Sequence, residues 1–145
     1  MLRSCLGLAL VLAVGAPALT AQTAGDERVL FSTSSEGGAT TEFWASDAVL
    51  LKTPEWRPAD GDPPLSVSRA VAIATAAARA QHPKFDDLEV RDVHIMAASC
   101  GRAVTRWFYS IDFSPVIDGQ KMYGGNIGAV VLMNGDVVEP RIKKK

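Results

Sequence analysis

The most regular pattern in the chain is helical. From Val67 to Ala78, apolar side chains recur every three or four residues, which places them on one face of a helix. Ser66 precedes this face and predicts an N-cap. His82-Pro83 follows it and predicts the helix end, because proline pushes the preceding residue out of the α region. Since the face is mostly alanine, the sequence predicts a helix over 66–81 that lies close against a sheet.

After this helix the hydrophobic period changes from 3.6 to 2, which predicts strands. Segment 106–113 has a single apolar face that we expect to meet the alanine face of the helix, made of Trp107, Tyr109, Ile111 and Phe113. In 88–96 the apolar residues change phase part-way, which predicts a bulge near Arg91-Asp92.

A hairpin is predicted near the C-terminus, where Asn134-Gly135 separates the apolar runs 127–133 and 137–138. Asn-Gly between such runs favours a two-residue turn in which both residues have positive φ. Short connections between consecutive strands then favour an antiparallel meander. The expected fold class is therefore α+β, with one main helix packed on a curled antiparallel sheet of about four strands.

Weaker strand signals precede the helix at 28–33, 40–45 and 48–52. In the first of them, Val29 and Phe31 share a face. Residues 54–64 contain four prolines, which excludes a helix or a central strand. We expect a connecting loop there, held to the body by Trp56.

The N-terminal segment has the charge and hydropathy of a secretory signal peptide. Arg3 is followed by an apolar run over 5–19 and then by small residues, and this run is shorter than the roughly 20 residues that span a bilayer. We expect a signal peptide over 1–21, cleaved after Ala21, and a disordered leader over 22–26. Cleavage after Ala18 and an uncleaved anchor are the alternatives. The predicted location is periplasmic or extracellular, with no membrane span left after cleavage.

The remaining chain has the size and composition of one domain. The 145 residues contain 48% hydrophobic side chains, enough for a packed core. We expect a single domain over 27–142, comprising N-terminal strands (27–53), the proline-rich loop (54–64) and a helix-plus-sheet core (65–142). Fifteen basic and sixteen acidic residues leave the chain almost neutral, which argues against a nucleic-acid partner.

Four segments together resemble the PepSY family of small exported domains, over about residues 64–140: PLSVSRAVAIATAAARAQHP, LEVRDVHIM, RWFYSIDF and AVVLMNGDVVEP. The resemblance implies a helix wrapped by a curled sheet and a binding or inhibitory role associated with peptidases or the cell envelope. Cystatin-like folds share this architecture, but their Gln-x-Val-x-Gly inhibitory loop is not found. The chain departs from the family in its N-terminal extension and its DGQKMYGGN loop.

Cys100 is the one cysteine outside the predicted signal peptide. The alternatives for its role are a thiol dyad with His82 or His94 and a disulfide to a partner. The predicted turn around Cys100 has no helix N-terminus to lower the thiol pKa, so we expect a free thiol.

No metal site, cofactor site or catalytic residue is predicted. The two histidines are eleven residues apart, and no ligand set is evident around them. The acidic run Asp86, Asp87, Glu89 and Asp92 is interpreted as a solvated face, with weak cation binding as the alternative. Neither Asp118-Gly119-Gln120, which lacks the later ligands of a calcium loop, nor the glycine-rich 123–126, which precedes a strand, adds a site. The C-terminal Lys143–Lys145 is expected to be a solvated tail.

The function that these patterns favour is an exported, non-enzymatic binding module whose partner is an unknown protein or envelope component. A small enzyme or ligand-binding protein that uses a pocket between helix and sheet is one alternative, and a structural subunit of an envelope assembly is another. A deep pocket with converging titratable groups would indicate an enzyme, whereas an exposed apolar patch or an unpaired sheet edge would indicate a binding module.

Overall fold

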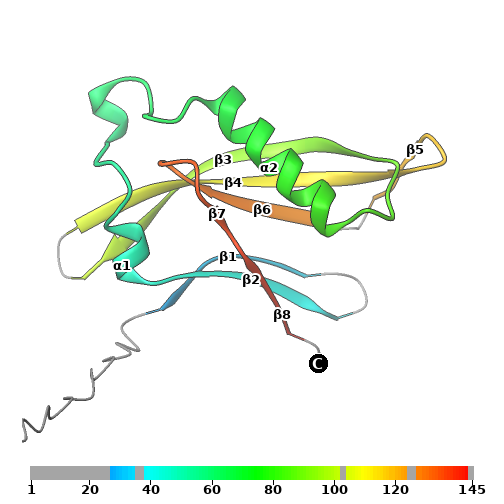
Figure 1. The fold of residues 1–145 in the computed structure, drawn as a ribbon, viewed down its shortest axis with the longest axis horizontal. Coiled ribbons are helices and arrows are strands. Elements are labelled where there is room, and N and C mark those ends of the chain that lie inside the picture. Colours follow the sequence, from blue (N-terminus) through cyan, green and yellow to red (C-terminus); the bar gives the residue numbers. More distant parts are fainter. Residues whose placement is uncertain (1–26, 35–37, 102–103, 124–126, 144–145) are drawn as a thin grey trace, which may run out of the picture.

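The computed structural model describes residues 27–34, 38–101, 104–123 and 127–143. The predicted signal peptide and leader lie outside these ranges. The fold is α+β, as predicted, and has three layers: helix α2, a central five-stranded antiparallel sheet, and a second antiparallel sheet of three strands (Figure 1). None of the described helices has the length and apolar content needed to cross a bilayer.

The central sheet has the strand order β3-β4-β6-β7, with β5 paired to the end of β4. Its strands are β3 (Asp87–Cys100), β4 (Val104–Ile117), β5 (Gln120–Lys121), β6 (Ile127–Leu132) and β7 (Val137–Val138). The register of β3 against β4 shifts between Val90 and Asp92. This shift confirms the bulge predicted from the change of hydrophobic phase.

Helix α2 (Val67–Gln81) covers one face of this sheet. Ser66 caps it by accepting a hydrogen bond from the Arg69 amide, and His82 ends it, as predicted. Its inward face consists of alanines with almost no exposure, which lets the helix approach the sheet closely: Ala70, Ala74 and Ala78. They pack against the predicted apolar face of β4, where the Tyr109 hydroxyl also donates to the Leu65 carbonyl at 2.6 Å.

The opposite face of the central sheet is covered by the second sheet, whose order is β1-β2-β8. It consists of β1 (Arg28–Ser34), β2 (Thr40–Ala45) and β8 (Pro140–Lys143). Its apolar side chains bury Phe108, Val130 and Leu132 of the central sheet. The central sheet therefore buries apolar side chains on both faces. The predicted sheet of about four strands was too small, and β8 was not predicted.

Two expectations about the N-terminal segment were wrong. Residues 48–52 do not form a strand, because helix α1 (Asp47–Leu50) begins there, with the Ser46 hydroxyl accepting from the Val49 amide. In β1, the register against β2 shifts between Val29 and Phe31. This irregularity turns Leu30 inward and leaves Val29 exposed, so Val29 and Phe31 do not share a face as predicted.

The predicted β6–β7 hairpin is present, but its turn differs from the two-residue type. The amide of Gly135 donates to the Leu132 carbonyl and the amide of Leu132 donates to the Asp136 carbonyl. Of the turn residues, Gly135 alone has a positive φ, 92°. The loop is thus three residues long, with glycine in the left-handed position.

The proline-rich loop lies over the body as predicted and contains the short 3-10 helix η1 (Pro58–Asp60). The Trp56 indole donates to the Gly61 carbonyl at 3.1 Å and meets the Trp107 ring edge-to-face, with 5.6 Å between centroids. Trp56 therefore attaches the loop to the helix side of the core.

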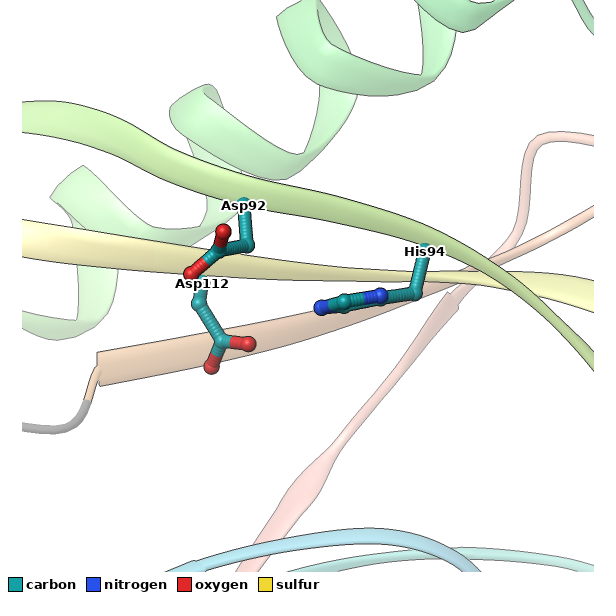
Figure 2. Close-up of side chains that lie close together, drawn as sticks. All are labelled: Asp92, His94 and Asp112. Atoms are coloured by element: carbon teal, nitrogen blue, oxygen red, sulfur yellow. The ribbon is translucent and has the colours of Figure 1, made fainter.

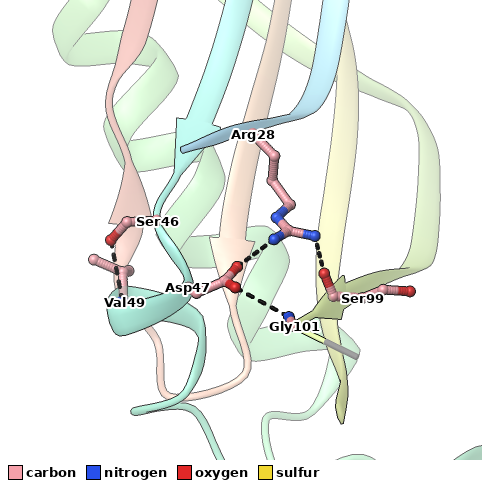
Figure 3. A network of polar contacts seen from close by, with 6 residues as sticks. All are labelled: Arg28, Ser46, Asp47, Val49, Ser99 and Gly101. Atoms are coloured by element: carbon pink, nitrogen blue, oxygen red, sulfur yellow. Dashed lines mark hydrogen bonds and ion pairs between the residues drawn. The ribbon is translucent and has the colours of Figure 1, made fainter. Parts of the chain in front are cut away.

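A polar network joins β1 and α1 to the end of β3 (Figure 3). The Arg28 guanidinium donates to the Ser99 carbonyl and pairs with Asp47. Asp47 also accepts the Gly101 amide at 3.0 Å. These contacts fix the end of the second sheet to the end of the β3–β4 hairpin.

Candidate functional site

Two neighbouring strands of the central sheet bring together Asp92, His94 and Asp112 (Figure 2). Asp92 and His94 are two residues apart on β3, and Asp92 lies directly opposite Asp112 of β4. The three side chains point away from α2, toward the second sheet. Each offers a ligand atom, and these atoms lie within 4.8 Å of one another.

The bulge in β3 is what places these side chains on one face. Before it, Leu88 packs on the helix side of the sheet; after it, Val93 does. Leu88 and Val93 share a face although they are five positions apart, an odd separation, so the strand changes phase between them, and Asp92 and His94 share the face of Asp112.

The cluster combines one buried and two exposed groups. Asp112 is 7% exposed, and burial raises the pKa of its carboxyl group above the ordinary value. The nearby Arg91 and His94 act in the opposite direction, while Asp92 reinforces the rise in pKa. The Arg91 guanidinium lies 3.8 Å from Asp112 and donates to Asp92 at 3.0 Å.

A buried hydroxyl lies on the same face. Ser110 is directly opposite His94 in the strand pair and precedes Asp112 by two residues, so its side chain points to the same side of the sheet. It is fully buried, and its Oγ has no hydrogen-bond partner among the described residues.

Sequence reasoning did not find this cluster. It assigned Asp92 to an acidic run and gave His94 no ligand partner. The structure separates that run: Asp86 accepts the Asp118 amide, Asp87 pairs with Arg79, and Glu89 pairs with Lys121. The spacing Asp-x-His in a strand was the available signal, but the partner on β4 follows only from the strand register.

The other sequence candidates are not part of this cluster. His82 caps α2 and lies beside Phe85, and both burial and Lys84 lower its pKa. The Asp118-Gly119 segment forms the β4–β5 turn, with positive φ at both residues. Arg102, Gly124–Asn126 and the end of the lysine tail lie outside the described residues.

Cys100 is the last residue of β3 and not part of a turn, which corrects the prediction. It is 2% exposed and lies in the apolar cluster between the two sheets. Burial and Asp47 raise the pKa of its thiol above the ordinary 9.0, against the opposing effects of Arg28 and Arg106. A buried, protonated thiol is a poor nucleophile and a poor partner for an intermolecular disulfide.

We expect Cys100 to make the protein more sensitive to alkaline pH. Because the folded-state pKa is raised, the thiol binds its proton more tightly in the folded chain, so stability falls as pH rises above 9. The slope from one group is at most about 1.4 kcal/mol per pH unit. Cys100→Ala should flatten this slope in urea unfolding between pH 8 and pH 10. An unchanged slope would show that the Cys100 thiol does not cause the loss of stability, since Tyr109, whose pKa is also raised by burial, remains in both proteins.

A surface hollow of about 540 Å³ opens between the start of α2 and the β6–β7 turn. Arg69 and Asp136 are the charged residues that line it. A smaller hollow of about 280 Å³ lies at the end of α2 beside Gly128 and the second sheet, and most of its lining is apolar or uncharged. Neither hollow contains the Asp92, His94 and Asp112 cluster.

The outer edge of β3 is the other candidate surface. β3 is the terminal strand of the central sheet, and no described strand pairs with its outer edge. Its first half carries Asp87, Glu89, Arg91 and Asp92 together with the bulge. In its second half, 93–100, His94 is the one side chain with an ionisable ring. Ile95 and Met96 lie in the same half and are 38% and 36% exposed.

No protein-family model, curated protein or solved structure matches this chain.

Proposed function

We propose that this chain is an exported, non-enzymatic binding module that pairs an extended segment of a partner protein with the outer edge of β3. One observation carries the proposal: within the described structure, this 14-residue strand pairs with another strand on one side only. The backbone groups of its free edge are a template on which a further strand can add.

The second half of β3 is the favoured docking segment. Edge strands in soluble proteins are protected by charges and bulges, and the first half of β3 has both. Residues 93–99 have neither. Ile95 and Met96 project to opposite faces at this edge, so an added strand would have an apolar contact on each side.

The partner that fits this edge is an extended, apolar segment of another protein. Backbone pairing supplies most of the affinity in this mode of recognition, and alternate side chains supply the specificity. The predicted signal peptide favours an encounter in the periplasm or outside the cell. The resemblance to PepSY domains favours a peptidase or an envelope protein as the source of the segment.

Site-specific cross-linking tests the proposal. A photoreactive side chain at the exposed Ala97 should cross-link one protein of the exported fraction, whereas the same group at the exposed Val67 of α2 should not. Met96→Lys, which adds a charge to the edge, should reduce the Ala97 cross-link about tenfold, and Val67→Lys should leave it unchanged.

The outward-facing amides of 93–99, which do not pair with β4, should also gain protection from hydrogen exchange when the partner is bound. Equal cross-linking from Ala97 and Val67, or no change in exchange at 93–99, would overturn the proposal. Cross-linking of Ala97 to a second copy of this chain would also overturn it, in favour of a self-assembling structural subunit.

A further inference from the structure

We propose that Asp92, His94 and Asp112 bind a divalent transition-metal ion, with Zn²⁺ as the ion that fits the ligands best. The site lies on the face of β3 and β4 opposite α2, near the bulge (Figure 2). It is a metal site in addition to the proposed docking edge and does not depend on it.

The ligand atoms are close enough to converge on one ion. In a tetrahedral zinc site with bonds of about 2.0–2.1 Å, ligand atoms are about 3.4 Å apart. The three groups already have atoms within 4.8 Å of one another without an ion. Asp92 and His94 are exposed, and rotation of their side chains toward the buried Asp112, with release of the Arg91–Asp92 hydrogen bond, would close the difference.

The charge pattern favours a cation at this point. Two carboxylates directly opposite one another in a strand pair repel, and one of them, Asp112, is buried. Arg91 offsets this repulsion incompletely, because its closest nitrogen is 3.8 Å from the Asp112 oxygen, beyond hydrogen-bond distance. A divalent ion between the carboxylates would neutralise both and would compete with Arg91 for them.

Ser110 is an independent indication of a ligand. Its hydroxyl is fully buried on this face, directly opposite His94, and has no partner among the described residues. Buried hydroxyl groups are nearly always hydrogen-bonded, so such a group requires an explanation. A water molecule that completes the coordination of a three-ligand ion would supply the missing partner.

The donor set selects the class of metal. Imidazole nitrogen suits zinc, copper, nickel and iron, whereas magnesium and calcium prefer oxygen ligands alone. Two carboxylates and one imidazole leave a fourth position open, as in zinc sites with three protein ligands. The exposure of Asp92 and His94 provides an entry path from solvent.

The test is metal titration of the full purified protein, produced without a histidine tag. Calorimetry should show one Zn²⁺ per chain, and Co²⁺ should give the absorption bands of a site with low coordination number. His94→Gln and Asp112→Asn should each weaken Zn²⁺ binding at least 10- to 100-fold, since even indirect changes at metal sites have effects of this size. The matched control is His82→Gln, which removes the other histidine and should leave the affinity unchanged.

Arg91→Gln distinguishes a site that binds a metal ion from a cluster in which Arg91 is the permanent ion-pair partner of the carboxylates. If the guanidinium competes with the ion, this variant should bind Zn²⁺ several-fold more tightly than the parent protein. Circular dichroism would show whether Asp112→Asn has kept the fold, and the exposed His94→Gln tests the site if it has not. Equal affinity in the parent and His94→Gln, or no Zn²⁺ binding by the parent and Arg91→Gln, would overturn the proposal.

Discussion

Phe108→Ala should lower the free energy of unfolding by about 3–5 kcal/mol, the cost of truncating a large aromatic side chain in a core. Phe108 is 1% exposed and lies between the two sheets, in the apolar cluster that contains Leu30, Phe43 and Leu132. Removing its ring leaves a cavity that two hydrogen-bonded sheets cannot readily close. Urea unfolding followed by circular dichroism measures the change.

The matched controls distinguish the two faces of β4. Phe113→Ala removes a ring of the same size from the helix side and should have a similar effect. Ile142→Ala truncates a residue that is 66% exposed on β8 and should change stability by less than about 0.5 kcal/mol. A loss below about 1 kcal/mol for Phe108→Ala alone would contradict the second sheet as a cover for this face.

Gly128→Val should also destabilise the protein, by about 1–3 kcal/mol, through overpacking between the sheets. A Cβ at Gly128 would lie 2.9 Å from the Phe31 ring and 3.1 Å from the Thr33 methyl group. Real Cβ atoms do not approach a ring carbon this closely, so β1 or its side chains must move. Thermal unfolding of the variant measures the effect.

A second substitution tests whether the contact with Phe31 causes this destabilisation. Phe31→Leu shortens the side chain that the new Cβ would meet, so Gly128→Ala combined with Phe31→Leu should be less destabilised than the sum of the single changes. Strict additivity would place the effect in the β6 backbone and contradict the close approach of β1. Gly128 does not have a positive φ, so its role is one of space rather than backbone conformation.

The elements that depend on local pattern were predicted well from the sequence. The helix over 66–81 was recognisable because its cap, its apolar face and its proline stop are all encoded within twenty residues. The phase of β4 followed from four alternating apolar residues, and the bulge in β3 followed from a change of phase in a single strand. The α+β class could be predicted from these elements and their order along the chain.

Turn details and weak strands were predicted less well, because neighbouring residues there favour different local structures. The run 48–52 looks like a strand by composition, but the Ser46 cap and the turn that follows it favour a short helix. Asn134-Gly135 has the residues of a two-residue turn, yet the pairing of Leu132 with Asp136 makes the loop one residue longer. In β1, an irregular register reverses the faces expected from alternation.

By itself, the sequence determined where the helix and the main strands lie and which face of β4 meets the alanines, because these follow from periodicity along the chain. The tertiary structure alone decided what covers the other face, because Pro140–Lys143 joins β2 although α2 and the whole central sheet lie between them in the sequence. It also decided that Asp92, His94 and Asp112 meet. A ligand set divided between strands depends on their register, and the register is set by packing between layers that no local pattern records.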